Sequence, residues 1–143
     1  MKKVFAILLS VYAFLLLTTS CGDLFSSSSR SIVGTWGMVS GGIKEGGSFS
    51  SLEEKEGTYY KTMVFLEDGT FTEQCGDATA TGTYEVKSSS IKYSYANVSG
   101  TGPAYFAIHK SGTWTYYFLD DDSFMLYDYA SSTEVSMRLK KIE

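Results

Sequence analysis

The sequence predicts an all-β fold, a single antiparallel up-and-down β-barrel of about eight strands behind a short N-terminal targeting segment. Three observations predict it. From Ile32 onward apolar and polar residues alternate with a period of two and no helical period appears. Short polar turns separate the alternating runs, so consecutive strands pair as neighbours. A meander of that length leaves two exposed edges, and closure into a barrel removes both.

Composition sets the class of protein. The chain has 143 residues, enough for one domain, and 16 acidic against 12 basic residues give it a net charge of −4. Nucleic acid is therefore not an expected partner. A single histidine and two cysteines argue against a His/Cys metal centre and against a disulfide framework, so we expect neither metal nor cofactor.

The first 20 residues have the form of a signal peptide. Positive charge at Lys2 and Lys3 precedes an apolar run, Val4–Leu17, that is shorter than the roughly 20 residues a membrane-spanning helix needs. Small residues follow it directly. We expect this segment, residues 1–20, to be removed on export.

The motif Leu17-Thr18-Thr19-Ser20-Cys21 resembles the lipobox of bacterial lipoproteins, although Thr18 replaces the commoner leucine. The resemblance implies cleavage before Cys21, a diacylglycerol on its sulfur and an acyl chain such as palmitate on its amine, which together anchor a protein stably. The alternative is an ordinary secretory signal. Residues 21–31 then form a polar tether ahead of a domain at 32–143.

In lipoproteins an Asp directly after the lipidated cysteine favours retention in the inner membrane. Here Gly22 follows Cys21 and the first acidic residue is Asp23, so the resemblance implies the outer membrane of the bacterial envelope. The periplasmic face and the cell surface both stay open.

Eight segments in chain order combine alternation with strand-forming residues. They are Val33–Ser40, Thr58–Leu66, Thr70–Cys75, Thr81–Lys87, Ile91–Ala96, Thr113–Leu119, Ser123–Tyr129 and Thr133–Ile142. The alternation predicts one buried and one solvated face for each strand.

Turn signals separate most of these segments, and two longer stretches interrupt them. Glu67-Asp68-Gly69-Thr70 is typical of a tight hairpin, with Gly69 at positive φ. Gly41–Glu56 is expected to be a long loop with a short helical turn near Ser50 and to act as a lid. Asn97–Gly112 is expected to form an extra strand or a flap.

A Gly-Thr-aromatic triplet recurs, and each copy is expected to begin a strand. The triplets begin at Gly34, Gly57, Gly69, Gly82 and Gly112. Their uneven spacing does not indicate a solenoid repeat, so we interpret them as hairpin signals.

The opening Gly34-Thr35-Trp36, the Asp-Gly-Thr hairpin and the basic final strand resemble a lipocalin, and in particular the short lipocalin-like domains of Bacteroidetes lipoproteins. The resemblance covers about residues 32–143. It implies a barrel in which Trp36 packs at the closed end under Arg138 from the last strand. The C-terminal helix and disulfides of larger lipocalins are absent.

Catalysis is not expected. His109 lies in an irregular stretch without a paired nucleophile, and we interpret it as a surface histidine. Cys75 lacks a neighbouring cysteine and is more typical of a buried structural thiol. Asp120-Asp121-Asp122 is interpreted as a solvated turn rather than a calcium site, since successive side chains diverge.

The chain has more aromatic residues than usual, and they bear on its function. A barrel of this size holds either a filled core or one small ligand, so these residues either fill the core or line a cup. The side chains predicted to line a cup are Trp36, Tyr60, Tyr84, Tyr93, Trp114, Tyr116 and Phe118. The leading hypothesis is a membrane-anchored, non-catalytic binder of a small apolar or amphipathic molecule. The alternative is an envelope interaction protein, such as a protease or lysozyme inhibitor or an accessory subunit, that acts through its loops around a filled core.

Overall fold

The computed structural model describes residues 30–103, 105–107, 109–129 and 133–142. The signal peptide, Cys21 and most of the tether therefore lie outside the described residues. Residues 31–143 form one compact unit. All residues of the hydrophobic core cluster lie within it, between Ile32 and Leu139. In the described part of the chain no helix is long and apolar enough to cross a membrane.

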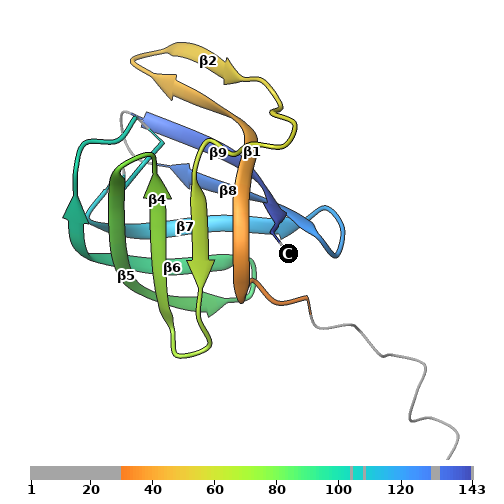
Figure 1. The fold of residues 1–143 in the computed structure, drawn as a ribbon, viewed down its shortest axis with the longest axis vertical. Helices are drawn as coiled ribbons and strands as arrows, with labels where there is room; N and C mark the ends of the chain where they lie inside the picture. Colours follow the sequence, from red (N-terminus) through yellow and green to blue (C-terminus); the bar gives the residue numbers. More distant parts are fainter. Residues whose placement is uncertain (1–29, 104, 108, 130–132, 143) are drawn as a thin grey trace, which may run out of the picture. The chain divides into compact units, whose positions relative to one another are not determined.

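In the described residues nine strands make up one antiparallel sheet (Figure 1). They are β1 (Gly34–Glu45), β2 (Ser48–Leu52), β3 (Thr62–Phe65), β4 (Thr70–Cys75), β5 (Ala78–Lys87), β6 (Ser90–Ser99), β7 (Ser111–Phe118), β8 (Ser123–Tyr129) and β9 (Thr133–Lys141). Their order is β2-β1-β3-β4-β5-β6-β7-β8-β9, and β1 also pairs with β9. With β2 set aside, the other strands close the predicted eight-stranded barrel.

Strand β1 closes the barrel and then continues beyond it. Its first residues, Gly34–Gly37, pair with β3, and its last, Gly41–Glu45, pair with β2. Along its other edge β1 pairs with β9 from Trp36 to Glu45. The β1–β2 hairpin therefore extends past the end of β3 (Figure 1).

The prediction of a loop with a helical turn at Gly41–Glu56 was wrong, because much of this stretch is the β1–β2 hairpin. Gly46 and Gly47 both have positive φ, +56° and +86°, as a two-residue hairpin turn requires. Strand β2 is exposed along almost its whole length, so it lacks the alternation that would have indicated a strand.

Several boundaries also differ from prediction. Pairing with β6 and β4 extends β5 back to Ala78, and β6 runs on to Ser99. The triplets at Gly57 and Gly82 do not begin strands: Gly57 lies in a loop, and Gly82 lies inside β5 beside a register shift. A Cβ at Gly82 would lie 2.3 Å from the Ser94 carbonyl oxygen, so glycine is needed for close strand packing.

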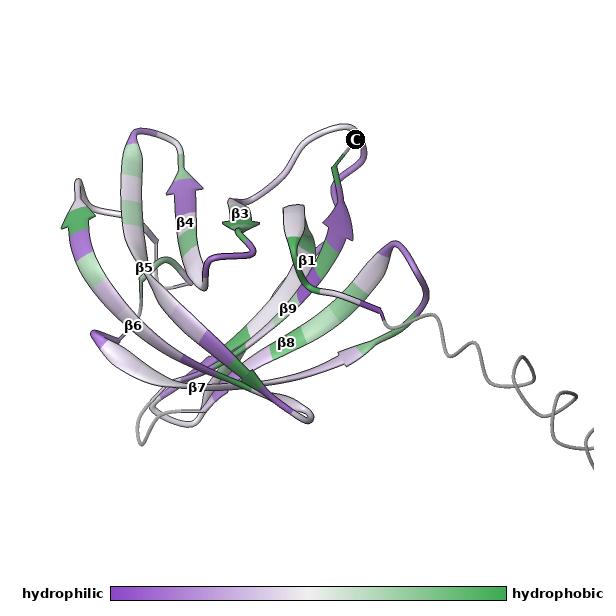
Figure 2. Ribbon diagram, turned by 90° about the horizontal axis from the view of Figure 1, so that it is seen from below, coloured by the Kyte–Doolittle hydropathy of each residue, from purple (hydrophilic) through white to green (hydrophobic). Residues whose placement is uncertain are grey.

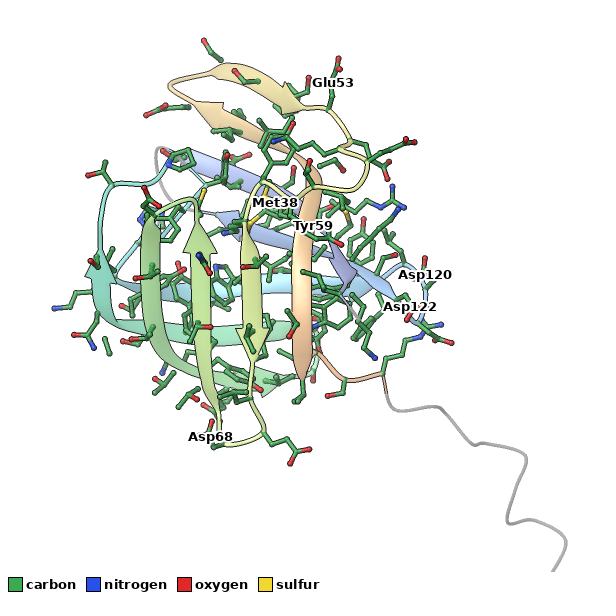
Figure 3. All side chains as sticks on the ribbon, in the orientation of Figure 1. Met38, Glu53, Tyr59, Asp68, Asp120 and Asp122 are labelled. Atoms are coloured by element: carbon green, nitrogen blue, oxygen red, sulfur yellow. The ribbon has the colours of Figure 1, made fainter. Side chains whose placement is uncertain are left out.

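The predicted hairpin at Glu67–Thr70 is confirmed. Gly69 has a φ of +81°, and Asp68 Oδ1 accepts a hydrogen bond from Thr70 N at 2.9 Å. Asp68 lies at the tip of this turn, and Asp120 and Asp122 lie on a different turn, between β7 and β8 (Figure 3).

The core lies inside the barrel, on the inward face of each wall strand. Hydropathy alternates in bands along strands such as β4 and β6, as the sequence pattern predicted (Figure 2). The largest fully buried side chains are Trp36, Met38, Met63, Phe65, Phe71, Ile91, Tyr93, Trp114, Phe124, Leu126, Met137 and Leu139. Burial of these side chains supplies the main stabilisation of the fold.

Candidate functional site

The seven aromatic residues predicted to line a cup all contact the interior, at two degrees of burial. Trp36, Tyr93 and Trp114 are fully buried. The other four, Tyr60, Tyr84, Tyr116 and Phe118, are half-buried and pack against the core.

Six of these aromatic side chains gather in two clusters, whereas Tyr60 packs edge-on against Tyr105. In the first, Trp36 packs edge-on against Phe124 with ring centroids 4.6 Å apart, and Tyr116 and Phe118 complete the group. Trp36 Nε1 donates to the Ile32 carbonyl at 2.6 Å, which ties the chain before β1 to this cluster.

The second cluster lies around Trp114. Tyr93 stacks on Trp114 with centroids 4.0 Å apart, and Phe65, Phe71 and Tyr95 pack edge-on around this pair. Tyr84 packs edge-on against Phe65. These contacts place a continuous group of aromatic rings in the middle of the barrel.

Arg138 lies on the opposite face of the wall from Trp36. It alternates with the buried Met137 and Leu139 on β9, so its side chain points outward, where Nη1 pairs with Glu54 Oε2 at 3.1 Å. The expectation that Arg138 covers Trp36 is therefore not met. Lys140 pairs with the same Glu54 at 3.2 Å, so the predicted basic strand binds the segment after β2.

A buried ion pair that sequence reasoning missed lies inside the barrel. Lys61 is 3% and Glu73 is 1% exposed, and Lys61 Nζ donates to Glu73 Oε1 at 2.5 Å. The Tyr95 hydroxyl donates to the other carboxylate oxygen, Oε2. Isolated buried charges are costly, and this pairing offsets that cost.

Described residues between β6 and β7 pack against this ion pair and the core, and we call Pro103, Tyr105, Phe106 and Ala107 the plug. Phe106 is buried in the core cluster, and the Tyr105 carbonyl accepts from Lys61 Nζ at 2.6 Å. Ala107 N donates to Glu73 Oε1 at 3.4 Å from a backbone with φ of +41°. The prediction of an extra strand or a flap at Asn97–Gly112 is corrected at both ends, because Asn97–Ser99 belong to β6 and Ser111 and Gly112 belong to β7. Between these strands Tyr105 and Ala107 bond to the ion pair.

Asp128 is a second buried carboxylate inside the barrel. Asp128 Oδ2 accepts from the Tyr93 hydroxyl at 2.8 Å and from Trp114 Nε1 at 3.0 Å. Gly112 makes room for this arrangement, because a Cβ there would lie 2.8 Å from the Tyr93 hydroxyl.

These surroundings keep both interior tyrosines neutral. Burial, followed by the hydrogen bond to Asp128, raises the pKa of Tyr93 well above its usual value. Burial, followed by the charge of Glu73, does the same for the pKa of Tyr95. Both hydroxyls therefore act as hydrogen-bond donors at any physiological pH.

The other residues singled out from the sequence lie apart from these carboxylates or beside the plug. Cys75 is half-buried and donates to the Tyr60 carbonyl at 3.1 Å, and burial raises the pKa of its thiol. His109 is half-buried rather than a plain surface residue, and its Nε2 has no hydrogen-bond partner among the described residues. The described residues contain no group of three or more His, Cys, Asp or Glu side chains placed to hold a metal.

The alternation contained a signal for both interior carboxylates. Glu73 follows Phe71 by two residues in β4, and Asp128 follows Leu126 by two in β8, so each falls on an apolar face. A carboxylate at such a position indicates a buried polar contact. Lys61 carried the same signal, because it precedes Met63 and Phe65 by two and four residues on the buried face of the predicted strand Thr58–Leu66, although it lies just before β3.

Comparisons with known proteins support the fold. No protein-family model and no curated protein matches the chain. Two solved structures do: a lipocalin-like protein from Bacteroides uniformis, with TM-score 0.53, 18% identity and coverage of 77% of this chain and 97% of that one; and an uncharacterized protein from Bacteroides eggerthii, with TM-score 0.52, 15% identity and coverage of 78% and 100%. The chain thus folds as a closed, eight-stranded, lipocalin-like barrel.

Proposed function

We propose that this lipocalin-like barrel is a non-catalytic binding protein of the bacterial cell envelope, anchored by lipid on Cys21, that takes a small amphipathic molecule inside the barrel in place of the plug. The observation that carries the proposal is the set of polar groups that converge inside the barrel: Lys61, Glu73 and Tyr95, with the Tyr105 carbonyl bonded to Lys61. An aromatic interior with a few convergent polar groups is the usual form of a small-molecule site.

The plug supplies the contacts that such a ligand would replace. Phe106 contributes one apolar side chain to the core, and the backbone of Tyr105 and Ala107 contributes one acceptor and one donor to the ion pair. A ligand that displaces the plug needs an apolar body and a head that both donates and accepts hydrogen bonds, such as a hydroxyl or an amide. The Lys61–Glu73 pair is neutral as a whole, so it favours an uncharged head.

Native mass spectrometry tests ligand binding. Residues 24–143, which lack the lipidated cysteine, are purified gently from the bacterial envelope and weighed. We expect an additional mass that is lost on denaturation. Phe106→Ala opens the plug and should raise the occupancy, whereas Tyr95→Phe removes a head contact and should lower it.

Tyr84→Phe is the matched control, because the Tyr84 hydroxyl donates to the Leu66 carbonyl, away from the ion pair. Recovery of the bare polypeptide mass from the parent chain and from Phe106→Ala would contradict the proposal.

The second candidate function, an envelope interaction protein with a filled barrel, is favoured by the packing around Trp114 and by the β1–β2 hairpin that projects from the barrel. It predicts that cross-linking in cells joins one envelope protein to residues near Phe49 on this hairpin. A ligand mass without any cross-linked protein would count against it.

A further inference from the structure

A hollow of about 180 Å³ lies on the outer face of the barrel, between the β1–β2 hairpin and strands β8 and β9. Its walls are Phe49 on one side and Tyr127 and Tyr129 on the other, and Gly42 and Ser136 form its floor. These side chains lie on the opposite face of the sheet from the interior carboxylates, so the hollow is independent of the proposed barrel site.

Strand register builds this hollow. One cross-strand row runs Phe49, Lys44, Glu134, Tyr129 from β2 to β8. The next row runs Ser51, Gly42, Ser136, Tyr127. In the second row only Tyr127 is large, whereas Ser51, Gly42 and Ser136 are small, so the sheet carries a valley beside the aromatic rings.

The aromatic walls are held in place and still face solvent. Phe49 is 69% and Tyr129 is 61% exposed. A Cβ on Gly42 would lie 2.7 Å from the Phe49 ring, so that ring lies directly over the glycine. Tyr127 and Tyr129 are parallel within 3°, with centroids 5.8 Å apart. Large aromatic rings gathered on the exposed face of a sheet are typical of a binding surface.

Polar groups at one end of the hollow define the chemistry of the ligand. Lys44 Nζ and Glu134 Oε1 are 3.4 Å apart and about half exposed, so this end has no net charge. The ammonium keeps further N–H donors and the carboxylate keeps further lone pairs for a ligand. A complementary molecule is uncharged, presents flat apolar faces to the rings, and offers hydroxyls that both donate and accept.

We propose that this outer hollow is a binding site for a neutral oligosaccharide. A pyranose ring has C–H groups on its faces and hydroxyls around its rim. The C–H faces suit the negative faces of Phe49 and Tyr129, and the hydroxyls suit Lys44, Glu134 and Ser136. Strands position these side chains, so the site is formed before the ligand arrives.

Isothermal titration of residues 24–143 against cello-, xylo-, manno-, malto- and chitotetraose, each to about 10 mM, tests the proposal. We expect at least one of these to bind. Phe49→Ala and Tyr129→Ala should each weaken that binding about tenfold or more. Gly42→Val fills the floor and should abolish it.

Tyr59→Ala is the matched control, because Tyr59 is an exposed ring that lies over Gly37, outside the hollow. Unchanged circular dichroism establishes that each variant folds, and the control should bind as the parent does. A panel with no binder overturns the proposal, as does an equal loss in Tyr59→Ala.

Sedimentation with phosphatidylethanolamine–phosphatidylglycerol vesicles separates a sugar site from a membrane contact. We expect the parent and Phe49→Ala to sediment alike. Vesicle binding that is lost in Phe49→Ala and Tyr129→Ala, without sugar binding, would overturn the proposal. If mass spectrometry finds no ligand inside the barrel, the proposal for this outer site still stands. The two proposals therefore fail in different experiments.

Discussion

Tyr93 and Trp114 stack inside the barrel, 4.0 Å between ring centroids and 14° from parallel, and both donate to the same oxygen, Asp128 Oδ2. The aromatic contact and the shared acceptor fix the two rings together. Because β6, β7 and β8 each supply one partner, this triad joins three neighbouring strands of the wall through their inward side chains.

Removal of the shared acceptor should destabilise the barrel strongly. Asp128→Ala leaves the Tyr93 hydroxyl and Trp114 Nε1 buried without a partner, and we expect a loss of about 2–4 kcal/mol in the free energy of unfolding. Asp128→Asn keeps an acceptor and should cost less. Urea denaturation measures both, with the exposed Asp77→Asn as control. Equal stability of Asp128→Ala and the parent would contradict the role assigned to this carboxylate.

The Lys61–Glu73 ion pair should behave as a coupled unit. Lys61→Met leaves Glu73 buried without its cation, and we expect a loss of about 3–5 kcal/mol. In the double variant Lys61→Met/Glu73→Gln no charge is left unpaired, and the glutamine still accepts from Tyr95, so stability should partly return. A double-mutant cycle by urea denaturation measures the coupling. Strictly additive losses would show that the two side chains act independently.

The interior tyrosines should make the fold sensitive to alkali. Burial first, and then the carboxylates, raise the pKa values of Tyr93 and Tyr95 in the folded state above the unfolded value of about 10. Their contribution to stability is complete below pH about 10 and is lost as pH rises further, because only the unfolded chain then releases these protons.

Above pH about 10.5 the free energy of unfolding should fall as pH rises. Each of these hydroxyls should contribute about 1.4 kcal/mol per pH unit to that slope. Tyr95→Phe should remove one such increment, measured by urea denaturation of the variant and the parent across this pH range. Identical slopes for the variant and the parent would contradict the assignment.

The path of the wall could be predicted from sequence because each part of it is encoded locally. Period-two alternation identifies the strands, and Asp68-Gly69 identifies a turn that any barrel would use in the same way. The β1–β2 hairpin was missed because β2 is exposed along almost its whole length. Neither face of β2 has to be apolar, so its sequence lacks the alternation that identifies a strand.

The candidate sites were predicted less well, because they depend on contacts between distant segments. Glu73 and Asp128 could have been singled out by their apolar faces, but nothing local identifies Lys61 or the Tyr105 carbonyl as partners of Glu73. The outer hollow requires the register of four strands, which follows from closure of the barrel rather than from any one segment.

The turn between β5 and β6 offers a test of backbone strain. Ser88 has a φ of +51°, a left-handed conformation that costs a residue with a Cβ about 1 kcal/mol. Ser88→Gly should therefore raise the free energy of unfolding by about 0.5–1 kcal/mol. Ser89→Gly, one residue further on without a positive φ, should lower it. Thermal and urea unfolding of this pair check the prediction, which a lower stability for Ser88→Gly would refute.

Lipid attachment at Cys21 stays a prediction from the sequence motif, and one residue tests it. Cys21→Ser removes the sulfur that the diacylglycerol requires, so the variant should lack the lipid mass and leave the membrane fraction, because stable anchoring takes more than one acyl chain. Cys75→Ser is the control, since that thiol lies in the barrel wall and donates to the Tyr60 carbonyl. Fractionation and intact-mass analysis measure both. A Cys21→Ser protein that stays in the membrane fraction would show that another feature of the chain holds it there.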